Sequence, residues 1–242
     1  MVSYPHHYAP PELRGASITR NNMLRAIFNK IVYLLLPQRC ISCSKFGEII
    51  CEKCLSQLSR ENNPYGAVSF YPYSNPTIKK AIWLLKYKGV YSVAEIFAQN
   101  IYGELIEELS DLLEMLNPDE NEKVLLIPAP LSKERLQKRG YNQSEIFAKE
   151  LLKINNNQNF ELATDILEKI KNTPSQVSIK DRGQRLKNLK GAFRLNPKTK
   201  SRLKNRIIVL IDDVITTGTT MEECAKVLKR GSPRKIIKIA LA

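Results

Sequence analysis

Histidine, tryptophan and long apolar runs are scarce in this chain of 242 residues. The only histidines are His6 and His7, so we expect no histidine-based catalytic site in the body of the protein. The apolar stretch at residues 31–36 falls far short of the ~20 residues that a membrane-spanning helix needs. The sequence therefore predicts a protein without a transmembrane segment.

The N-terminus also lacks the features of a secretory signal. Residues 1–16 are polar and contain proline, with no apolar central region and no clear cleavage pattern. We therefore expect residues 1–22 to form a flexible tail and the protein to be cytoplasmic.

Acidic residues are few relative to basic ones. The 38 Lys and Arg residues outnumber the 24 Asp and Glu residues, which gives a net charge of +14. Such an excess favours nucleic acid, phosphorylated ligands or acidic partners, although charge alone is equally compatible with a basic surface of no special role. The hydrophobic content of 43% argues against wholesale disorder.

Four of the five cysteines are concentrated in two C-x2-C pairs, separated by residues 44–50: Cys40, Cys43, Cys51 and Cys54. Zn²⁺ in closed structural sites takes four tetrahedral sulfur ligands, and paired C-x2-C motifs supply them. Two disulfides or four unmodified thiols are the alternatives, and a cytosolic setting disfavours the disulfides. We expect a structural zinc module over residues 23–62, whereas Cys224 in a predicted helix is expected to be a core residue.

The remaining residues, 63–242, alternate between apolar strands and amphipathic helices. Such alternation predicts an α/β domain with a parallel sheet flanked by helices, and with its ligand at the carboxyl ends of the strands. The expected strands are 124–127, 207–211 and 235–241, and the expected helices are 92–116, 142–153 and 220–229.

The most informative segment follows the strand at 207–211. Two carboxylates, Asp212 and Asp213, precede a Thr- and Gly-rich loop that opens a helix. A helix N-terminus with a glycine nearby forms an anion cradle, and carboxylates beside it accept hydrogen bonds from sugar hydroxyls or bear on a bound metal. The segment therefore predicts a site for a phosphorylated sugar, in preference to a solvated acidic turn. The loop residues are Thr216, Thr217, Gly218, Thr219 and Thr220.

This segment resembles the signature of type I phosphoribosyltransferases, which bind 5-phosphoribosyl-1-pyrophosphate (PRPP). The resemblance implies that Asp212 and Asp213 hold the ribose hydroxyls. It also implies that residues 216–220 hold the 5-phosphate.

Further segments are similar to those of the ComF family, in the family's order. They are the cysteine pairs, residues 84–89 (LLKYKG), 127–132 (IPAPLS), 139–143 (RGYNQ) and 173–193, which contains R-x-x-N-x-x-G-A-F-like spacing. The resemblance implies a role in natural transformation, at the uptake of single-stranded DNA, with other competence proteins as possible partners. It also identifies the fold as type I phosphoribosyltransferase-like.

The segment 130–140 is expected to be a loop. In the phosphoribosyltransferase fold, the corresponding loop binds the pyrophosphate, usually together with a Mg²⁺ ion that shields its charge. Arginine suits such a loop because its guanidinium donates two hydrogen bonds to one phosphate group. The candidates for this role are Lys133, Arg135, Arg139 and Gly140, and the alternative is an ordinary basic loop. Lys86, Tyr87 and Lys88 are weaker candidates, readable as surface lysines and a core tyrosine.

Residues 180–206 carry eleven Lys or Arg residues and one acidic residue, Asp181. Two roles fit a stretch this basic. It closes over the bound sugar as a flexible loop, or it contacts the phosphate backbone of a nucleic acid. Phe193 fits a core strand better than a base-stacking platform. The candidates for the loop or for DNA are Arg182, Arg185, Lys187, Lys190 and Arg194.

Two functions follow from these features. The first is a binding protein for DNA import, with PRPP or a nucleotide as a regulatory ligand. The second is an enzyme that transfers phosphoribose from PRPP to a base or another nucleophile and releases pyrophosphate. The sequence contains no recognisable base-binding element or general base, so the catalytic residues stay unassigned.

Overall fold

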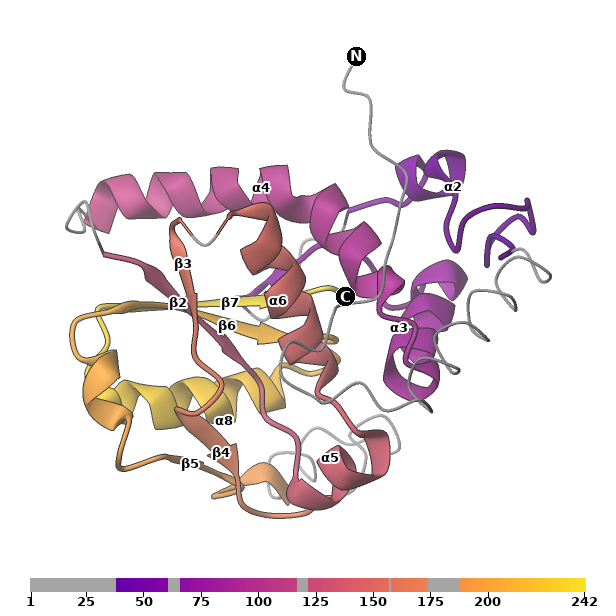
Figure 1. The fold of residues 1–242 in the computed structure, drawn as a ribbon. Coiled ribbons are helices and arrows are strands. Elements are labelled where there is room, and N and C mark those ends of the chain that lie inside the picture. The colour runs from indigo at the N-terminus through magenta and orange to yellow at the C-terminus, as the bar shows by residue number, and fades with distance from the viewer. Residues whose placement is uncertain (1–37, 61–65, 117–121, 157, 174–187) are drawn as a thin grey trace, which may run out of the picture.

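The computed structural model describes residues 38–60, 66–116, 122–156, 158–173 and 188–242, and the expected tail at residues 1–22 lies outside them. Its centre is a five-stranded parallel sheet in the order β1-β7-β6-β2-β3 (Figure 1). The strands are β1 (Val68–Ser69), β2 (Val124–Pro128), β3 (Phe160–Leu162), β6 (Ile207–Asp212) and β7 (Lys235–Ala240). The predicted α/β fold with a parallel sheet is confirmed.

Helices cover both faces of the sheet, as a parallel sheet requires. Figure 1 shows α4 and α6 on one side and α8 on the other. Successive residues of β2 alternate between two hydrophobic cores, one under each layer of helices. The first layer contains α3 (Pro76–Lys88), α4 (Ser92–Leu116) and α6 (Gln143–Ile154), and the second contains α8 (Thr219–Leu228) with the short helices η2 (Lys200–Leu203) and η3 (Lys229–Gly231).

A separate antiparallel ribbon packs on the α8 side. It consists of β4 (Leu167–Lys169) and β5 (Phe193–Leu195). Leu167 and Phe193 are buried in the core beneath α8. Phe193 is thus a core residue, and a stacking role for it is excluded.

The segment 130–140 is not a loop, and that expectation was wrong. Residues Lys133–Arg139 form the helix α5. Ser132 caps its N-terminus by accepting a hydrogen bond from the backbone N–H of Arg135, and Gly140 ends it in the left-handed conformation, with φ of 81°. Both capping signals are present in the sequence.

The chain crosses to opposite faces of the sheet after two neighbouring strands. From β2 it continues through α5 into α6, which lies on the face that α4 also covers, whereas from β6 it continues into α8 on the other face. Neighbouring strands with opposite crossovers leave a crevice at their carboxyl ends, where α/β proteins bind their ligands. In this protein that crevice lies between Pro128 and Asp212.

The cysteine segment packs onto the same core as the first helical layer. Cys40, Cys51 and Cys54, the last in the short helix α2 (Glu52–Ser56), are buried in one cluster with Tyr71. Arg60 also connects the two regions, because its guanidinium pairs with Glu104 of α4 at 2.5 Å. The cysteine segment is therefore part of the structure that supports α3 and α4.

Candidate functional site

A cavity lies at the predicted crevice, beyond the ends of β2 and β6. It brings together most of the sequence-predicted ligand residues: Asp212, Asp213, Thr216, Thr217, Gly218, Thr219, Thr220, Arg135 and Arg139. Two other candidates, Lys133 and Gly140, are not among its lining residues. Lys133 instead lines a neighbouring hollow beside the β4–β5 ribbon.

Asp212 is held at the end of β6 by two hydrogen bonds. Its Oδ1 accepts from the hydroxyl of Ser144, at 3.1 Å, and from the backbone N–H of Asp213, at 2.9 Å. Burial raises the pKa of Asp212 to about 7, and the neighbouring carboxylate of Asp213 adds to this shift. A carboxyl group with this pKa is protonated in part of the molecules near neutral pH.

Asp213 is paired with a lysine from another element. Its Oδ2 lies 2.8 Å from Nζ of Lys86, near the end of α3, and both side chains are largely buried. Although burial opposes the charged form of Lys86, the carboxylates of Asp213 and Asp212 raise the pKa of its ammonium group. Lys86 is thus a charged residue of the site, and its interpretation as a surface lysine was wrong.

The loop after Asp213 leads into the N-terminus of α8. Gly218 precedes the helix with φ of 72°, in the left-handed region that favours glycine. The hydroxyls of Thr217 and Thr219 lie 3.1 Å apart, and the N-cap residue Gly218 has no side chain with which to cap α8. The first N–H groups of α8 and the threonine hydroxyls therefore form a cradle suited to an anion.

Cations face this cradle from α5 and β4. Arg135 and Arg139 lie one turn apart on α5 and both line the cavity. Arg135 donates to the carbonyl of Thr173 at 2.5 Å, and Arg139 donates to the side-chain oxygen of Gln143. Lys169 also lines the cavity, and burial together with the charge of Arg135 lowers its pKa.

Lys169 was not singled out from the sequence, and Gln143 was named there only as part of the RGYNQ segment, with no role assigned to it. Lys169 comes from a short strand and reaches the site only through the tertiary position of the β4–β5 ribbon, so no local signal could have found it. Gln143 is the last residue of the RGYNQ segment, so a local signal for it is present in the sequence.

The basic stretch at residues 180–206 is only partly described, and Arg182, Arg185 and Lys187 lie outside the described residues. Arg194 pairs with Glu168 across the β4–β5 ribbon at 2.8 Å. Arg202 and Arg206 both pair with Glu161, at 2.7 and 3.0 Å. Acidic residues from earlier in the chain therefore already balance three of these arginines.

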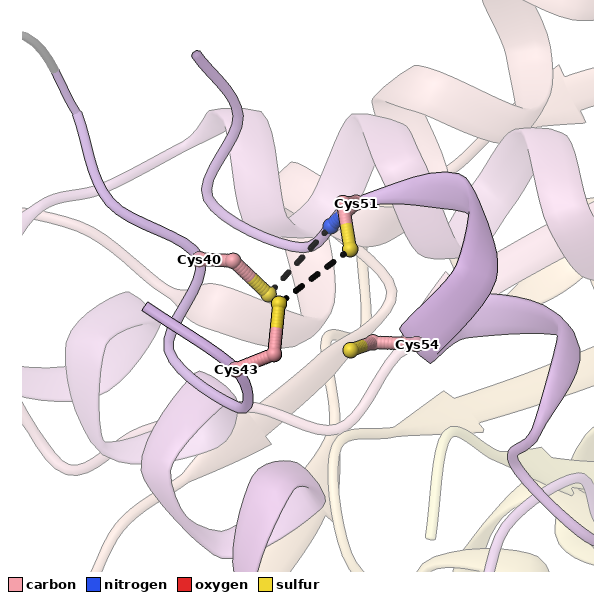
Figure 2. Close-up of side chains that lie close together, drawn as sticks. All are labelled: Cys40, Cys43, Cys51 and Cys54. Carbon is pink, nitrogen blue, oxygen red and sulfur yellow. Dashed lines mark hydrogen bonds between the residues drawn. The ribbon is translucent and has the colours of Figure 1, made fainter. Parts of the chain in front are cut away.

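The four predicted cysteine ligands converge (Figure 2). Their sulfur atoms all lie within 4.8 Å of one another, and Sγ of Cys43 and Cys51 are 3.6 Å apart. A tetrahedron with Zn–S bonds of ~2.3 Å has sulfur–sulfur edges of ~3.8 Å, so the cluster fits this metal. All four cysteines are free thiols, and the disulfide alternative is not supported.

Backbone N–H groups also favour thiolates in this cluster. The N–H of Cys51 donates to Sγ of Cys40 at 3.4 Å. Burial opposes the thiolate of Cys40, but N–H groups of Cys43, Cys51 and Ser42 outweigh it and lower its pKa to about 6. Cys224 is buried in α8, away from this cluster, where burial raises its pKa well above the ordinary value.

Among the helices of the described residues, none combines the length and the apolar character needed to cross a membrane.

Several known proteins are similar to parts of this chain. Residues 137–242, which include the Asp212–Asp213 pair and the threonine loop, match the family model "Phosphoribosyl transferase domain". The chain is 38% identical over 107 residues to competence protein F of Haemophilus influenzae, covering 43% of this chain and 44% of that protein. It is 26% identical over 187 residues to competence protein ComFC of Bacillus subtilis, covering 77% of this chain and 65% of that protein.

A third relative is the DNA utilization protein YhgH of Escherichia coli strain K12, 32% identical over 105 residues and covering 43% of each chain. Among solved structures, the hypoxanthine phosphoribosyltransferase of Trypanosoma cruzi aligns with a TM-score of 0.37 and 10% identity, covering 60% of this chain and 64% of that one. The chain thus spans less than half the length of competence protein F. In its cysteine cluster, its phosphoribosyltransferase-like sheet and its similarity to competence proteins F and ComFC, the chain resembles the ComF family.

Proposed function

We propose that this protein binds PRPP with Mg²⁺ at the cavity between β2 and β6, and that it binds single-stranded DNA in natural transformation. The observation that carries the first part is the convergence, in one cavity, of an acidic pair, a helix N-terminus and two arginines. PRPP needs all three, because it combines a ribose, a 5-phosphate and a pyrophosphate.

Each group of the cavity has a task in this proposal. The N–H groups at the start of α8 and the hydroxyls of residues 216–220 hold the 5-phosphate. Asp212 and Asp213 accept hydrogen bonds from the ribose hydroxyls, while Lys86 fixes the orientation of Asp213. Arg135 and Arg139 hold the pyrophosphate, and Mg²⁺, when bound with it, neutralises part of its charge.

The proposal that the protein binds DNA rests on its net positive charge and on the names of its relatives. The net charge is +14, and the relatives are named as competence and DNA utilization proteins. Of the sequence-predicted candidates for phosphate contacts, Lys190 is the described one that we retain, because the charge of Arg194 is already paired with Glu168. The other three, Arg182, Arg185 and Lys187, lie outside the described residues. We further propose that residues 23–62 act as a structural zinc module for the phosphoribosyltransferase-like domain at 63–242, and that the protein works in the cytoplasm.

Isothermal titration calorimetry with PRPP and Mg²⁺ tests the ligand assignment. We expect Asp212→Ala with Asp213→Ala to abolish binding, since each sugar hydroxyl left unpaired costs roughly 1–3 kcal/mol. Glu107→Ala with Glu108→Ala is the matched control, because it removes two adjacent carboxylates from an exposed part of α4. Equal affinity of wild type and the Asp double variant would refute the assignment.

Catalysis is the second candidate function, and the acidic pair, the anion cradle and the two arginines in one cavity favour it. The zinc-loaded protein is incubated with PRPP, Mg²⁺ and a panel of bases, and pyrophosphate is measured. Steady release with one base identifies a transferase, whereas binding without release identifies a PRPP-responsive binding protein.

A further inference from the structure

Helix α3 presents two large aromatic rings to solvent. Trp83 is 47% exposed and Tyr87 is 61% exposed. They lie one helical turn apart, with ring centroids 6.1 Å from each other. The apolar face of α3 is formed by other residues, among them Ile78, Ile82 and Leu85, so the two rings contribute little to the core. Tyr87 is thus not the core residue that the sequence suggested.

Cations surround both rings. Nζ of Lys88 lies 5.4 Å from the centroid of Trp83, and the guanidinium of Arg139 lies 5.3 Å from that of Tyr87. Helix α3 contains no acidic residue, and three of its four lysines, Lys79, Lys80 and Lys88, are exposed. An anionic partner is therefore favoured along the whole exposed face of α3.

This face connects the two sites described above. Near the start of α3, Lys80 donates to the backbone carbonyl of Ile41 in the cysteine segment, at 3.4 Å. Near its end, Tyr87 lines the cavity between β2 and β6. Trp83 lies between these points, so a chain-like ligand on α3 would run from the cysteine centre toward the cavity.

From this arrangement we infer that single-stranded nucleic acid binds along α3, with bases stacked on Trp83 and Tyr87 and phosphates near Lys80, Lys88 and Arg139. The inference rests on the DNA-binding part of the proposed function. Proteins that bind single strands combine aromatic platforms with cations that follow the backbone. Cores of protein–protein interfaces are instead depleted of lysine, which disfavours a protein partner on this face.

The chain provides its own probe of this site, because Trp83 is its only tryptophan. The zinc-loaded full chain is titrated with a labelled oligo-dT and with an abasic oligonucleotide of the same length. Anisotropy of the label measures binding, and fluorescence of Trp83 measures stacking. We expect both strands to bind, dT more tightly, and only dT to quench Trp83.

Variants separate stacking from charge. Trp83→Ala and Tyr87→Ala should each weaken dT binding ~10-fold without changing its salt dependence, since no charge is lost. Trp83→Phe and Tyr87→Phe keep a ring and should bind nearly as wild type. Phe46→Ala is the matched control, because Phe46 is 55% exposed but already has the guanidinium of Arg39 at 3.6 Å from its ring centroid.

The outcomes distinguish this inference from the proposed function. Wild-type dT affinity in both Ala variants, with no quenching of Trp83, would overturn the stacking site and leave DNA binding intact. An absence of any anisotropy change in the wild type would overturn both. A change of Trp83 fluorescence with protein concentration alone, abolished by Tyr87→Ala, would assign this face to a second copy of the chain instead.

Discussion

Nζ of Lys86 lies 2.8 Å from Oδ2 of Asp213, which joins the end of α3 to the loop that follows β6. The two residues are distant in sequence, and both side chains are largely buried. A buried ion pair adds little net stability compared with apolar residues, but removing one partner leaves an uncompensated charge.

We therefore expect Lys86→Met to lower the free energy of unfolding by about 3 kcal/mol, because it leaves Asp213 buried without its partner. Urea denaturation measures this change. Lys86→Met combined with Asp213→Leu should recover much of the loss, since neither charge then remains. A double variant less stable than the single one would show that the pair does not act as a unit. Lys88→Met, which removes a lysine from an exposed position of the same helix, is the control.

Asp212 gives a prediction about pH. Its pKa is raised from 3.8 to about 7, so the folded protein keeps a proton that the unfolded chain has released between those values. Stability conferred by the protonated carboxyl is therefore lost progressively as pH rises from about 4 to about 7. Asp212→Asn cannot ionise and should be more stable than wild type at pH 8, by roughly 2–4 kcal/mol, with a smaller advantage at pH 5.

Thermal unfolding at the two pH values measures this effect, and the same variant should bind PRPP more weakly. A stability advantage that does not change with pH would contradict the raised pKa of Asp212. Asp165→Asn provides the control, because Asp165 is at the surface and pairs with Arg202.

The cysteine cluster should hold about one Zn²⁺ per chain in freshly isolated, reduced protein. Cys40→Ser or Cys54→Ser should lose the metal and much of the solubility, because metal binding stabilises small modules of this kind. Cys224→Ser should keep it, since Cys224 lies apart in α8. Elemental analysis measures the content, and metal-free wild-type protein would rule the site out.

Loss of zinc should also destabilise the helices α3 and α4. Cys40, Cys51 and Cys54 share one core with Tyr71 and Ile78, so opening of the cluster exposes that core. Hydrogen exchange with and without a chelator should show lost protection in α3, but little change in α8, which packs on the other face of the sheet.

Two basic residues of the 180–206 stretch should differ in their effect on DNA binding. The backbone carbonyl of Lys190 accepts a hydrogen bond from Nζ of Lys171, and this contact does not involve the ammonium group of Lys190. The guanidinium of Arg194, by contrast, is paired with the carboxylate of Glu168. Lys190→Gln should therefore reduce the log–log salt slope of binding by about 0.7, the value for one phosphate contact. Arg194→Gln should leave the slope nearly unchanged, and the reverse result would place the strand on the β4–β5 ribbon.

Local patterns predicted the elements that carry the acidic pair and the anion cradle. The apolar run before Asp212 becomes β6, and the threonines after it open α8 within one residue of the expected start. These features were readable because strand, loop and helix follow one another directly in the sequence. The convergence of the four cysteines was readable for the same reason, since short spacing limits where the sulfur atoms lie.

Contacts between distant segments were not readable in the same way. Lys86 belongs to the site only because α3 packs beside the end of β6, and Lys169 only because the β4–β5 ribbon lies next to α5. The three arginines that pair with Glu161 and Glu168 looked like free cations, because their acidic partners precede the basic stretch in sequence.

The order of the strands bears on how the chain reaches this fold. The strand β1 pairs only with β7 among the described residues, through Val68 with Ile239 and Ser69 with Ala240. During synthesis on the ribosome, the segment around Val68 emerges long before its partner strand and has no sheet edge to join. Pairing between such distant segments folds slowly, because loop closure precedes the stabilising contacts. The nascent chain thus exposes the apolar segment around Val68 until β7 has been made.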